Sequence, residues 1–227
     1  MVESPETIRI WRLEMVATEA TDGIDVLSAE ERARAVRFRR PSDRKRWEWS
    51  RIKLRQVLGE CIRVPASDIV FATAENGKPS LANADICCPH FNLSHAGDVL
   101  VVAVSNDYPV GIDVEQVKQL GNLDEVARYS LSQDEYKRFQ DAPVQDRMRL
   151  FYYYWTQKEA VLKATGQGLG GLGTVDLAEV GALSETTSSP WHRGPGWSVR
   201  SIDVPAGYRG AVAVSGKSGG VAIRYEL

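Results

Sequence analysis

The feature that most constrains the fold is a short pattern that occurs twice, about half a chain apart. The tetrapeptide VAVS stands at 102–105 and again at 212–215, and an apolar segment that begins with glycine follows each copy, GIDV at 111 and GVAI at 220. A repeated order of strand, turn and strand favours two similar lobes, and 227 residues, 43% of them hydrophobic, suffice for a core in each. We therefore expect an α+β fold of two similar α/β lobes, an N-terminal lobe over 1–108 and a C-terminal lobe over 109–227.

The first glycine-led segment carries two acids that the second lacks. In GIDVE, Asp113 and Glu115 alternate with the apolar Ile112 and Val114. Because successive side chains of a strand point to opposite faces, we expect the apolar pair in the core and both carboxylates together on the other face. Like charges this close repel each other, so a cation or solvent must compensate them.

The segment WTQKEAVLKATGQGL at 155–169 is predicted to form a helix that ends at Gly166. Glu159 and Lys163 are four residues apart and so lie on one face of that helix. One interpretation is an exposed ion pair, worth on the order of a few tenths of a kcal/mol. The other is that Glu159 joins the two strand acids in an oxygen-rich site for Mg²⁺, with Lys163 facing a substrate phosphate.

A third segment, FNLSH at 91–95, lies downstream of the tripeptide GKP at 77–79. Ser94 and His95 are adjacent, so on a strand they point to opposite faces, which argues against a hydrolase dyad. The simpler interpretations are a capping or core-rim role for His95 and a solvated turn for Lys78.

Cysteine content and the N-terminal segment bear on location. The three cysteines, two of them adjacent at 87 and 88, make a poor disulfide framework, and with the nearby histidines they match no usual zinc spacing. The N-terminus lacks the basic start and apolar stretch of a signal peptide, and the longest apolar run, VLVVAV at 99–104, is too short to span a bilayer. We therefore expect a cytoplasmic protein that has no membrane segment.

Positive charge is concentrated in one segment, although the net charge of the chain is −2. Residues 32–55 hold eleven Arg and Lys against two acids. A nucleic-acid-binding face is one interpretation. Phe38, Trp47 and Trp49 occur there at helical spacings that are more typical of core packing than of base stacking, and the sequence contains no known nucleic-acid motif. We therefore expect no nucleic-acid partner.

Two helices are predicted around this basic segment, and a helical middle is predicted over 122–165. Ser28 with Glu31 predicts a capping box for the first helix, which should end near Arg40. Asp43 predicts the N-cap of the second helix, because Pro41 and the following serine interrupt the pattern.

In their order and spacing, FNLSH, GIDVE and WTQKEAVLKATGQGL resemble the 4′-phosphopantetheinyl transferases, and in particular the larger type in which two similar lobes are fused. The resemblance covers roughly residues 28–170. It implies a pseudo-twofold fold with the active site at the lobe interface. It also implies transfer of the phosphopantetheine arm of coenzyme A to a serine of an apo acyl or peptidyl carrier protein, with Mg²⁺ as cofactor and adenosine 3′,5′-bisphosphate as the released product. Fused lobes imply a monomer.

The resemblance assigns roles to individual positions. Three acids would hold the metal, namely Asp113, Glu115 and Glu159. Lys163 would contact the pyrophosphate as a catalytic residue. The coenzyme would be lined by Lys78, Asn92, Ser94, His95 and Asp113, and its 3′-phosphate region would meet Arg34 and Arg46.

The base that deprotonates the carrier serine has three candidates in this comparison: Glu135, Glu159 and a metal-bound water. Ser132 lies three residues before Glu135, so a capping-box role is the structural alternative for that glutamate. Glu31 stands near a position where some relatives carry lysine, and it would either weaken a phosphate contact or simply cap a helix.

Two other functions remain open on the residues alone. A different Mg²⁺-dependent enzyme acting on a nucleotide or pyrophosphate would use the same acids, although the chain has no phosphate-binding loop and no GxGxxG. The second is a nucleic-acid-binding protein that uses residues 32–55.

Overall fold

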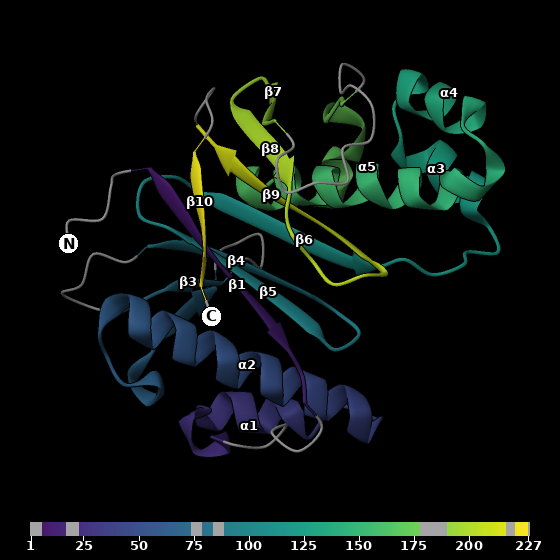
Figure 1. Cartoon of the computed structure of the whole chain (residues 1–227). Helices are drawn as coiled ribbons and strands as arrows, with labels where there is room; N and C mark the ends of the chain where they lie inside the picture. The colour runs from purple at the N-terminus through teal and green to yellow at the C-terminus, as the bar shows by residue number, and fades with distance from the viewer. Residues whose placement is uncertain are drawn as a thin grey trace.

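The computed structural model describes residues 6–16, 23–73, 79–83, 89–177, 190–216 and 221–226. Two four-stranded sheets lie against each other in the middle of the molecule, with α1 and α2 on one side and α3, α4 and α5 on the other (Figure 1). The first sheet has the order β10-β1-β5-β4 and the second has the order β6-β9-β8-β7. A two-stranded sheet joins β2 and β3.

The strands are β1 (Thr7–Glu14), β2 (Phe71–Thr73), β3 (Pro79–Leu81), β4 (His90–Ala96), β5 (Val99–Ser105), β6 (Val110–Gln116), β7 (His192–Gly194), β8 (Trp197–Ser201), β9 (Tyr208–Ser215) and β10 (Ala222–Glu226). The α-helices are α1 (Ala29–Ala35), α2 (Pro41–Ile62), α3 (Leu123–Ser130), α4 (Gln133–Asp141) and α5 (Val144–Thr165). Three 3₁₀ helices are η1 (Ile24–Val26), η2 (Ala66–Asp68) and η3 (Leu169–Thr174).

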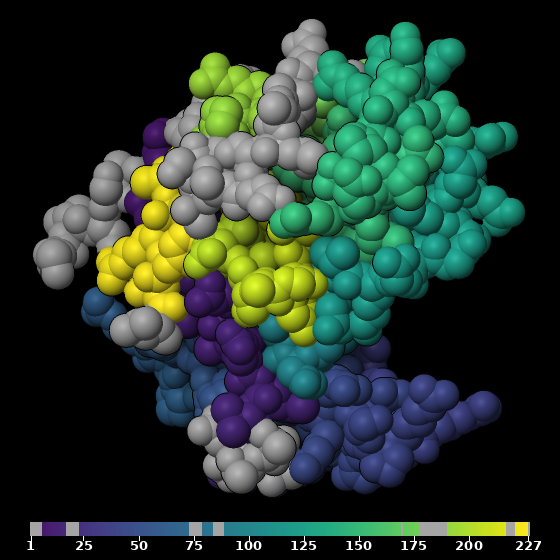
Figure 2. Space-filling model, turned by 45° about the vertical axis from the view of Figure 1, so that its right-hand side comes forward, coloured from purple at the N-terminus to yellow at the C-terminus, as the bar shows by residue number. Residues whose placement is uncertain are grey.

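The prediction of two similar α/β lobes is confirmed. The two VAVS copies lie in β5 and β9, and each of these strands pairs antiparallel with the first long strand of its own sheet, β1 or β6. The long helices α2 and α5 have 22 residues each and cover the outer faces of the two sheets. From the side shown in Figure 2, the regions of α1 and of α3–α4 project with a hollowed surface between them.

The last strand does not stay with the second half of the chain. After β9 the chain returns to the first sheet, where β10 pairs parallel with β1 and Ala222 lies opposite Thr7. The step from β5 to β6 carries the chain from the first sheet to the second, and the step from β9 to β10 carries it back. The strands that follow the two VAVS copies, β6 and β10, therefore each lie in the other sheet from the strand before them.

Three buried apolar clusters hold the layers together, as hydrophobic burial requires. One lies between α2 and the first sheet and includes Trp49, Leu58 and Val102. A second, which includes Ile10 and Ile112, fills the space between the two sheets. The third lies between α5 and the second sheet and includes Phe151. Among the described residues, no helix combines the length and the apolar character that crossing a membrane would need.

The local predictions around the basic segment are partly confirmed. Ser28 and Glu31 form the predicted capping box at the start of α1. The predicted N-cap at Asp43 is wrong, because α2 begins at Pro41 with Arg40 as its N-cap. The reason is that proline suits the first turn of a helix, where its missing N–H would be unpaired anyway. The chain leaves α1 already after Ala35 rather than near Arg40.

Candidate active site

Strand β6 places Asp113 and Glu115 on the face that α5 covers. Ile112 and Val114 are buried in the cluster between the sheets, so the predicted alternation is present. Asp113 is only 3% exposed, whereas Glu115 is half-buried. A charged side chain at such a depth needs compensation by a cation or by hydrogen bonds.

Gly111 brings the strand and the helix unusually close together at this point. A Cβ atom built on Gly111 would lie 2.1 Å from the carbonyl oxygen of Ala160 and 2.4 Å from the amide nitrogen of Ala164. Both are backbone atoms of α5, so no side-chain rotation could make room. Glycine therefore permits the approach that puts α5 directly over the acids of β6.

Lys163 forms a salt bridge with the strand acid Asp113. Its Nζ lies 2.7 Å from Asp113 Oδ1 and also donates to Ser94 Oγ at 3.2 Å and to the carbonyl oxygen of Ile112 at 3.3 Å. Ser94 Oγ in turn donates to Asp113 Oδ1 at 2.9 Å. The contact joins α5 to β6, so this lysine does more than form a surface pair within its own helix.

The other two acids share one electrostatic environment with Asp113. Burial, and then the charge of Asp113, raises the pKa of both Glu115 and Glu159, and Lys163 acts in the opposite direction on both. A side-chain hydrogen bond from Trp155, one turn before Glu159 on α5, also favours the charged form of Glu115. The charge of Asp113 therefore acts on both glutamates, so the three carboxylates belong to one site.

The donor set fits a hard divalent cation. Among the described residues, Asp113 Oδ2 and Glu159 Oε1 are buried carboxylate oxygens without a hydrogen-bond partner. Within those same ranges, no three His, Cys, Asp or Glu side chains form a ready-made metal site. The protein thus offers part of a coordination shell, which suits Mg²⁺ because this ion keeps water and takes oxygens from a substrate.

The predicted coenzyme-lining residues on β4 divide into two groups. Asn92 is buried, and its Oδ1 accepts a hydrogen bond at 3.0 Å from the backbone amide of Ile112, so it fastens β4 to β6. Ser94 faces the acids, whereas His95 lines a pocket on the opposite side, as their adjacency predicted. Burial, followed by the charges of Lys163 and Arg46, lowers the pKa of His95.

Glu135 lies in a different environment from the other acids. It is fully buried and forms an ion pair with the equally buried Lys158, with Glu135 Oε2 2.8 Å from the lysine Nζ. The same carboxylate accepts from the backbone amides of Ser132 and Leu177 and completes the capping box of α4. The geometry thus favours the structural alternative for Glu135, because the carboxylate has no exposed surface from which to reach a carrier serine.

A pocket of about 790 Å³ lies between α1, α2, the β2–β3 sheet and the His95 side of β4. Its lining includes the predicted Arg34 and His95, and also Glu31, Arg51 and Arg55, which the motifs did not single out as ligands. The pairing of Arg46 is different, because it contacts Asp98 at 3.1 Å and Asp43 at 3.7 Å. Lys78 lies outside the described residues.

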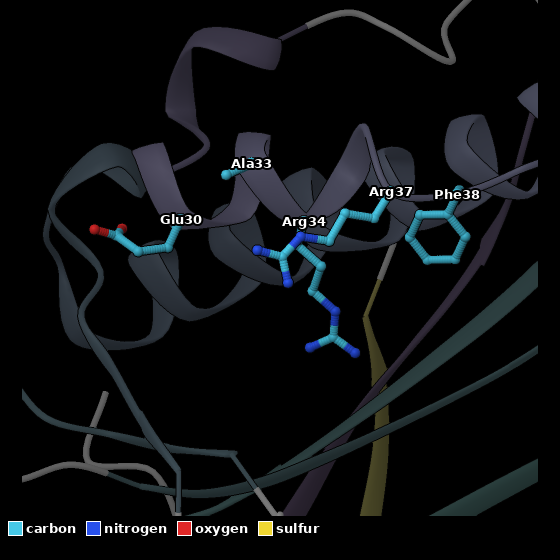
Figure 3. Close-up of a pocket in the computed structure, with 5 residues that line it drawn as sticks. All are labelled: Glu30, Ala33, Arg34, Arg37 and Phe38. Carbon is cyan, nitrogen blue, oxygen red and sulfur yellow. The ribbon is translucent and has the colours of Figure 1, made fainter.

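A second hollow, of about 620 Å³, adjoins the first along α1. Figure 3 shows Glu30 at one end of this hollow and Phe38 at the other, with Arg34 and Arg37 between them. Glu30 and Arg34 line both hollows, so the two hollows adjoin along this part of α1. Sequence reasoning missed Arg51 and Trp155, although each lies four residues from another site residue on its helix.

Comparisons with known proteins agree with this geometry. The N-terminal domain of 4′-phosphopantetheinyl transferases matches residues 15–107, and the 4′-phosphopantetheinyl transferase superfamily matches residues 109–213. The chain is 31% identical to the 4′-phosphopantetheinyl transferase HetI of Nostoc sp., over 93% of this chain and 89% of the relative. It is 38% identical to psf-1 of Bacillus pumilus, over 74% of this chain and 71% of the relative. With Sfp of Bacillus subtilis the identity is 30%, over 83% and 82% of the two chains.

The chain therefore belongs to the 4′-phosphopantetheinyl transferase superfamily and is an enzyme of that class. Within it, the pairing of an N-terminal domain with a superfamily domain in one chain is the Sfp-like arrangement.

Proposed function

We propose that this enzyme transfers the 4′-phosphopantetheine arm of coenzyme A to a serine of an apo acyl or peptidyl carrier protein, releases adenosine 3′,5′-bisphosphate and requires Mg²⁺. The observation that carries the proposal is the convergence of Asp113, Glu115, Glu159 and Lys163 where α5 crosses β6. Asp113, Glu115 and Glu159 would hold Mg²⁺, which when bound would neutralise charge on the pyrophosphate.

The protein side chains supply the remaining chemistry. The serine oxygen forms a bond to the phosphorus that carries pantetheine, while the bond from this phosphorus to the bridging oxygen of the pyrophosphate breaks. Lys163 contacts the pyrophosphate and stabilises the charge that leaves with adenosine 3′,5′-bisphosphate. We assign the proton of the serine hydroxyl to Glu159, which lies one turn from Lys163 on α5, because the alternative Glu135 is fully buried in its ion pair with Lys158.

Intact mass spectrometry of an apo carrier protein tests this proposal directly. The carrier is incubated with the enzyme, coenzyme A and Mg²⁺, with Glu159→Ala and an EDTA sample as controls. A gain of one phosphopantetheine that disappears in both controls is expected. If several types of carrier gain no mass and coenzyme A does not bind, the proposed reaction is refuted.

Two finer properties are part of the same proposal. We propose that the enzyme acts as a monomer, because the two sheets pack against each other within one chain through a shared apolar cluster. We also propose the cytoplasm as its location. Light scattering at several concentrations measures the first property, and a stable dimer would contradict it.

A further inference from the structure

An acid lies inside the otherwise basic pocket beside α1. The Glu31 carboxylate contacts two arginines from α2: its Oε1 accepts from Arg51 Nε at 2.9 Å and Nη2 at 2.7 Å, and its Oε2 accepts from Arg55 Nε at 2.7 Å. Both oxygens are therefore engaged by cations, and Oε2 also completes the capping box by accepting from the Ser28 amide at 3.0 Å. Glu31 is an anion whose charge the protein itself compensates.

The two arginines differ in what they have left for a ligand. Arg55 is buried, and its Nη1 donates to the carbonyl oxygens of Ala66 and Ile69 at 3.0 and 2.9 Å. The Arg51 side chain is 17% exposed and lines the pocket. Arg51 donates to Glu31 through Nε and Nη2. Of the five N–H donors of its guanidinium, the two on Nη1 make no hydrogen bond to another described residue and can bind a ligand.

Aromatic rings also contact the flat face of the Arg51 guanidinium. Its guanidinium carbon lies 4.4 Å from the ring centroid of Phe71, a cation–π contact, and 6.0 Å from that of Trp47. A carboxylate thus fixes one edge of the guanidinium, and an aromatic ring covers its face. The side chain therefore loses little conformational entropy when it binds a ligand. Such a group is preorganised to bind an anion.

The position of Arg51 in the pocket indicates which anion it meets. Coenzyme A carries a pyrophosphate and a separate 3′-phosphate. His95 lines the same pocket and is near enough to Lys163 for the lysine charge to lower its pKa, so in the proposed reaction the pyrophosphate lies between His95 and Lys163. Arg51 and Arg34 line the pocket where α1 meets α2, and they face the remaining anion.

We propose that Arg51 binds the 3′-phosphate of coenzyme A and that Glu31 is a positioning residue that aims it. This inference rests on the proposed function. A carboxylate near a phosphate would ordinarily weaken phosphate binding by repulsion. In this proposal Glu31 strengthens phosphate binding, because it holds Arg51 in place.

The preference for coenzyme A over 3′-dephospho-coenzyme A measures this contact. For each enzyme variant we would determine kcat/KM with both substrates on one carrier protein. Arg51→Gln should reduce the preference about tenfold to a hundredfold, the range for a lost charge-assisted hydrogen bond, mainly by lowering kcat/KM for coenzyme A. Lys45→Gln is the matched control, since it removes one exposed charge from the same helix without lining either hollow. An unchanged preference in Arg51→Gln would overturn the inference.

The Glu31→Gln variant tests positioning against repulsion by the sign of its effect. Glutamine can keep the capping box, so α1 retains its start. We expect a several-fold lower kcat/KM for coenzyme A and little change for 3′-dephospho-coenzyme A. If Glu31 acted by repulsion, the variant would instead use coenzyme A better than the wild type, and the positioning role would be wrong.

A binding experiment separates this inference from the proposed reaction and needs no carrier protein. Calorimetry compares adenosine 3′,5′-bisphosphate with adenosine 5′-monophosphate on the wild type, Arg51→Gln and Arg51→Lys. The wild type should prefer the bisphosphate, Arg51→Gln should lose that preference, and Arg51→Lys should fall between them. If the wild type transfers phosphopantetheine but shows no such preference, the inference fails alone. If the wild type transfers nothing from coenzyme A to any carrier, the proposed function fails instead.

Discussion

Gly111→Ala is the substitution whose effect follows most directly from the structure. The added Cβ would lie 2.1 Å from the carbonyl oxygen of Ala160, whereas ordinary contacts of a Cβ begin at 3.4 Å. Because the obstacle is helix backbone, α5 must withdraw from β6 by roughly 1 Å to relieve the overlap. Glu159 and Lys163 lie on α5, so both would move away from Asp113.

The expected magnitudes concern both stability and rate. Overpacking of this kind costs about 1–3 kcal/mol, and the lower unfolded-state entropy of alanine returns only about 0.4–1 kcal/mol of that. We therefore expect a lower midpoint in urea unfolding. A misplacement of about 1 Å at a reacting centre costs roughly a hundredfold in rate, so the transfer rate should fall to about a hundredth while the protein still folds.

Urea denaturation and the initial rate of carrier modification, both with saturating Mg²⁺, measure these two effects. Gly121→Ala is the matched control, because a Cβ there meets nothing within 4 Å and the backbone does not adopt a positive φ. The control should keep its rate and its unfolding midpoint. Full activity and an unchanged midpoint in Gly111→Ala would refute the close-approach reasoning.

Glu159→Gln removes a half-buried charge whose Oε1 has no hydrogen-bond partner among the described residues, so transfer should fall to background. The thermal midpoint in EDTA should rise by about 2–4 °C for each kcal/mol relieved, and a lower midpoint would contradict this. Burial raises the pKa of Glu115 and Glu159, so the folded chain holds their protons more tightly than the unfolded chain does. The free energy of unfolding in EDTA should therefore decrease as the pH rises from 4.5, the ordinary carboxyl pKa, through the raised pKa values. Thermal melts at a series of pH values measure this decrease, and added Mg²⁺ should reverse it. Asn92→Ala leaves a buried amide of β6 without its acceptor, which should cost about 1–3 kcal/mol in urea unfolding. Lys158→Met leaves Glu135 buried without its counter-charge and should cost about 3–5 kcal/mol, whereas adding Glu135→Gln should recover much of that loss in the same assay.

The parts of the fold that depend on nearby residues were predictable from sequence. The alternation of Asp113 and Glu115 with apolar neighbours placed both acids on one face of β6, and Gly166 ended α5 with a φ of 76°. Four-residue spacing also placed Glu159 and Lys163 on one helix face. Each of these predictions uses a local period or a local cap, which the sequence displays directly.

Contacts between distant segments could not be predicted in this way. Glu135 satisfied the capping-box pattern and the catalytic interpretation equally well, and only its burial against Lys158 distinguished them. Glu31 looked like a simple helix cap because its ion pair with Arg51 joins two helices across 20 residues. The parallel pairing of β10 with β1 spans almost the whole chain, and no local pattern marks it.

The return of β10 to the first sheet also determines when the protein can fold during synthesis. Thr7 and Ala222 are partners in one sheet but are made 215 residues apart, so the ribosome completes nearly all of the chain before the first sheet can close. Until then β1 presents an unpaired edge, the kind of surface that recruits other chains. We therefore expect nascent chains that stop before β10 to bind chaperones or aggregate, even though every residue of the acidic site has already been synthesised.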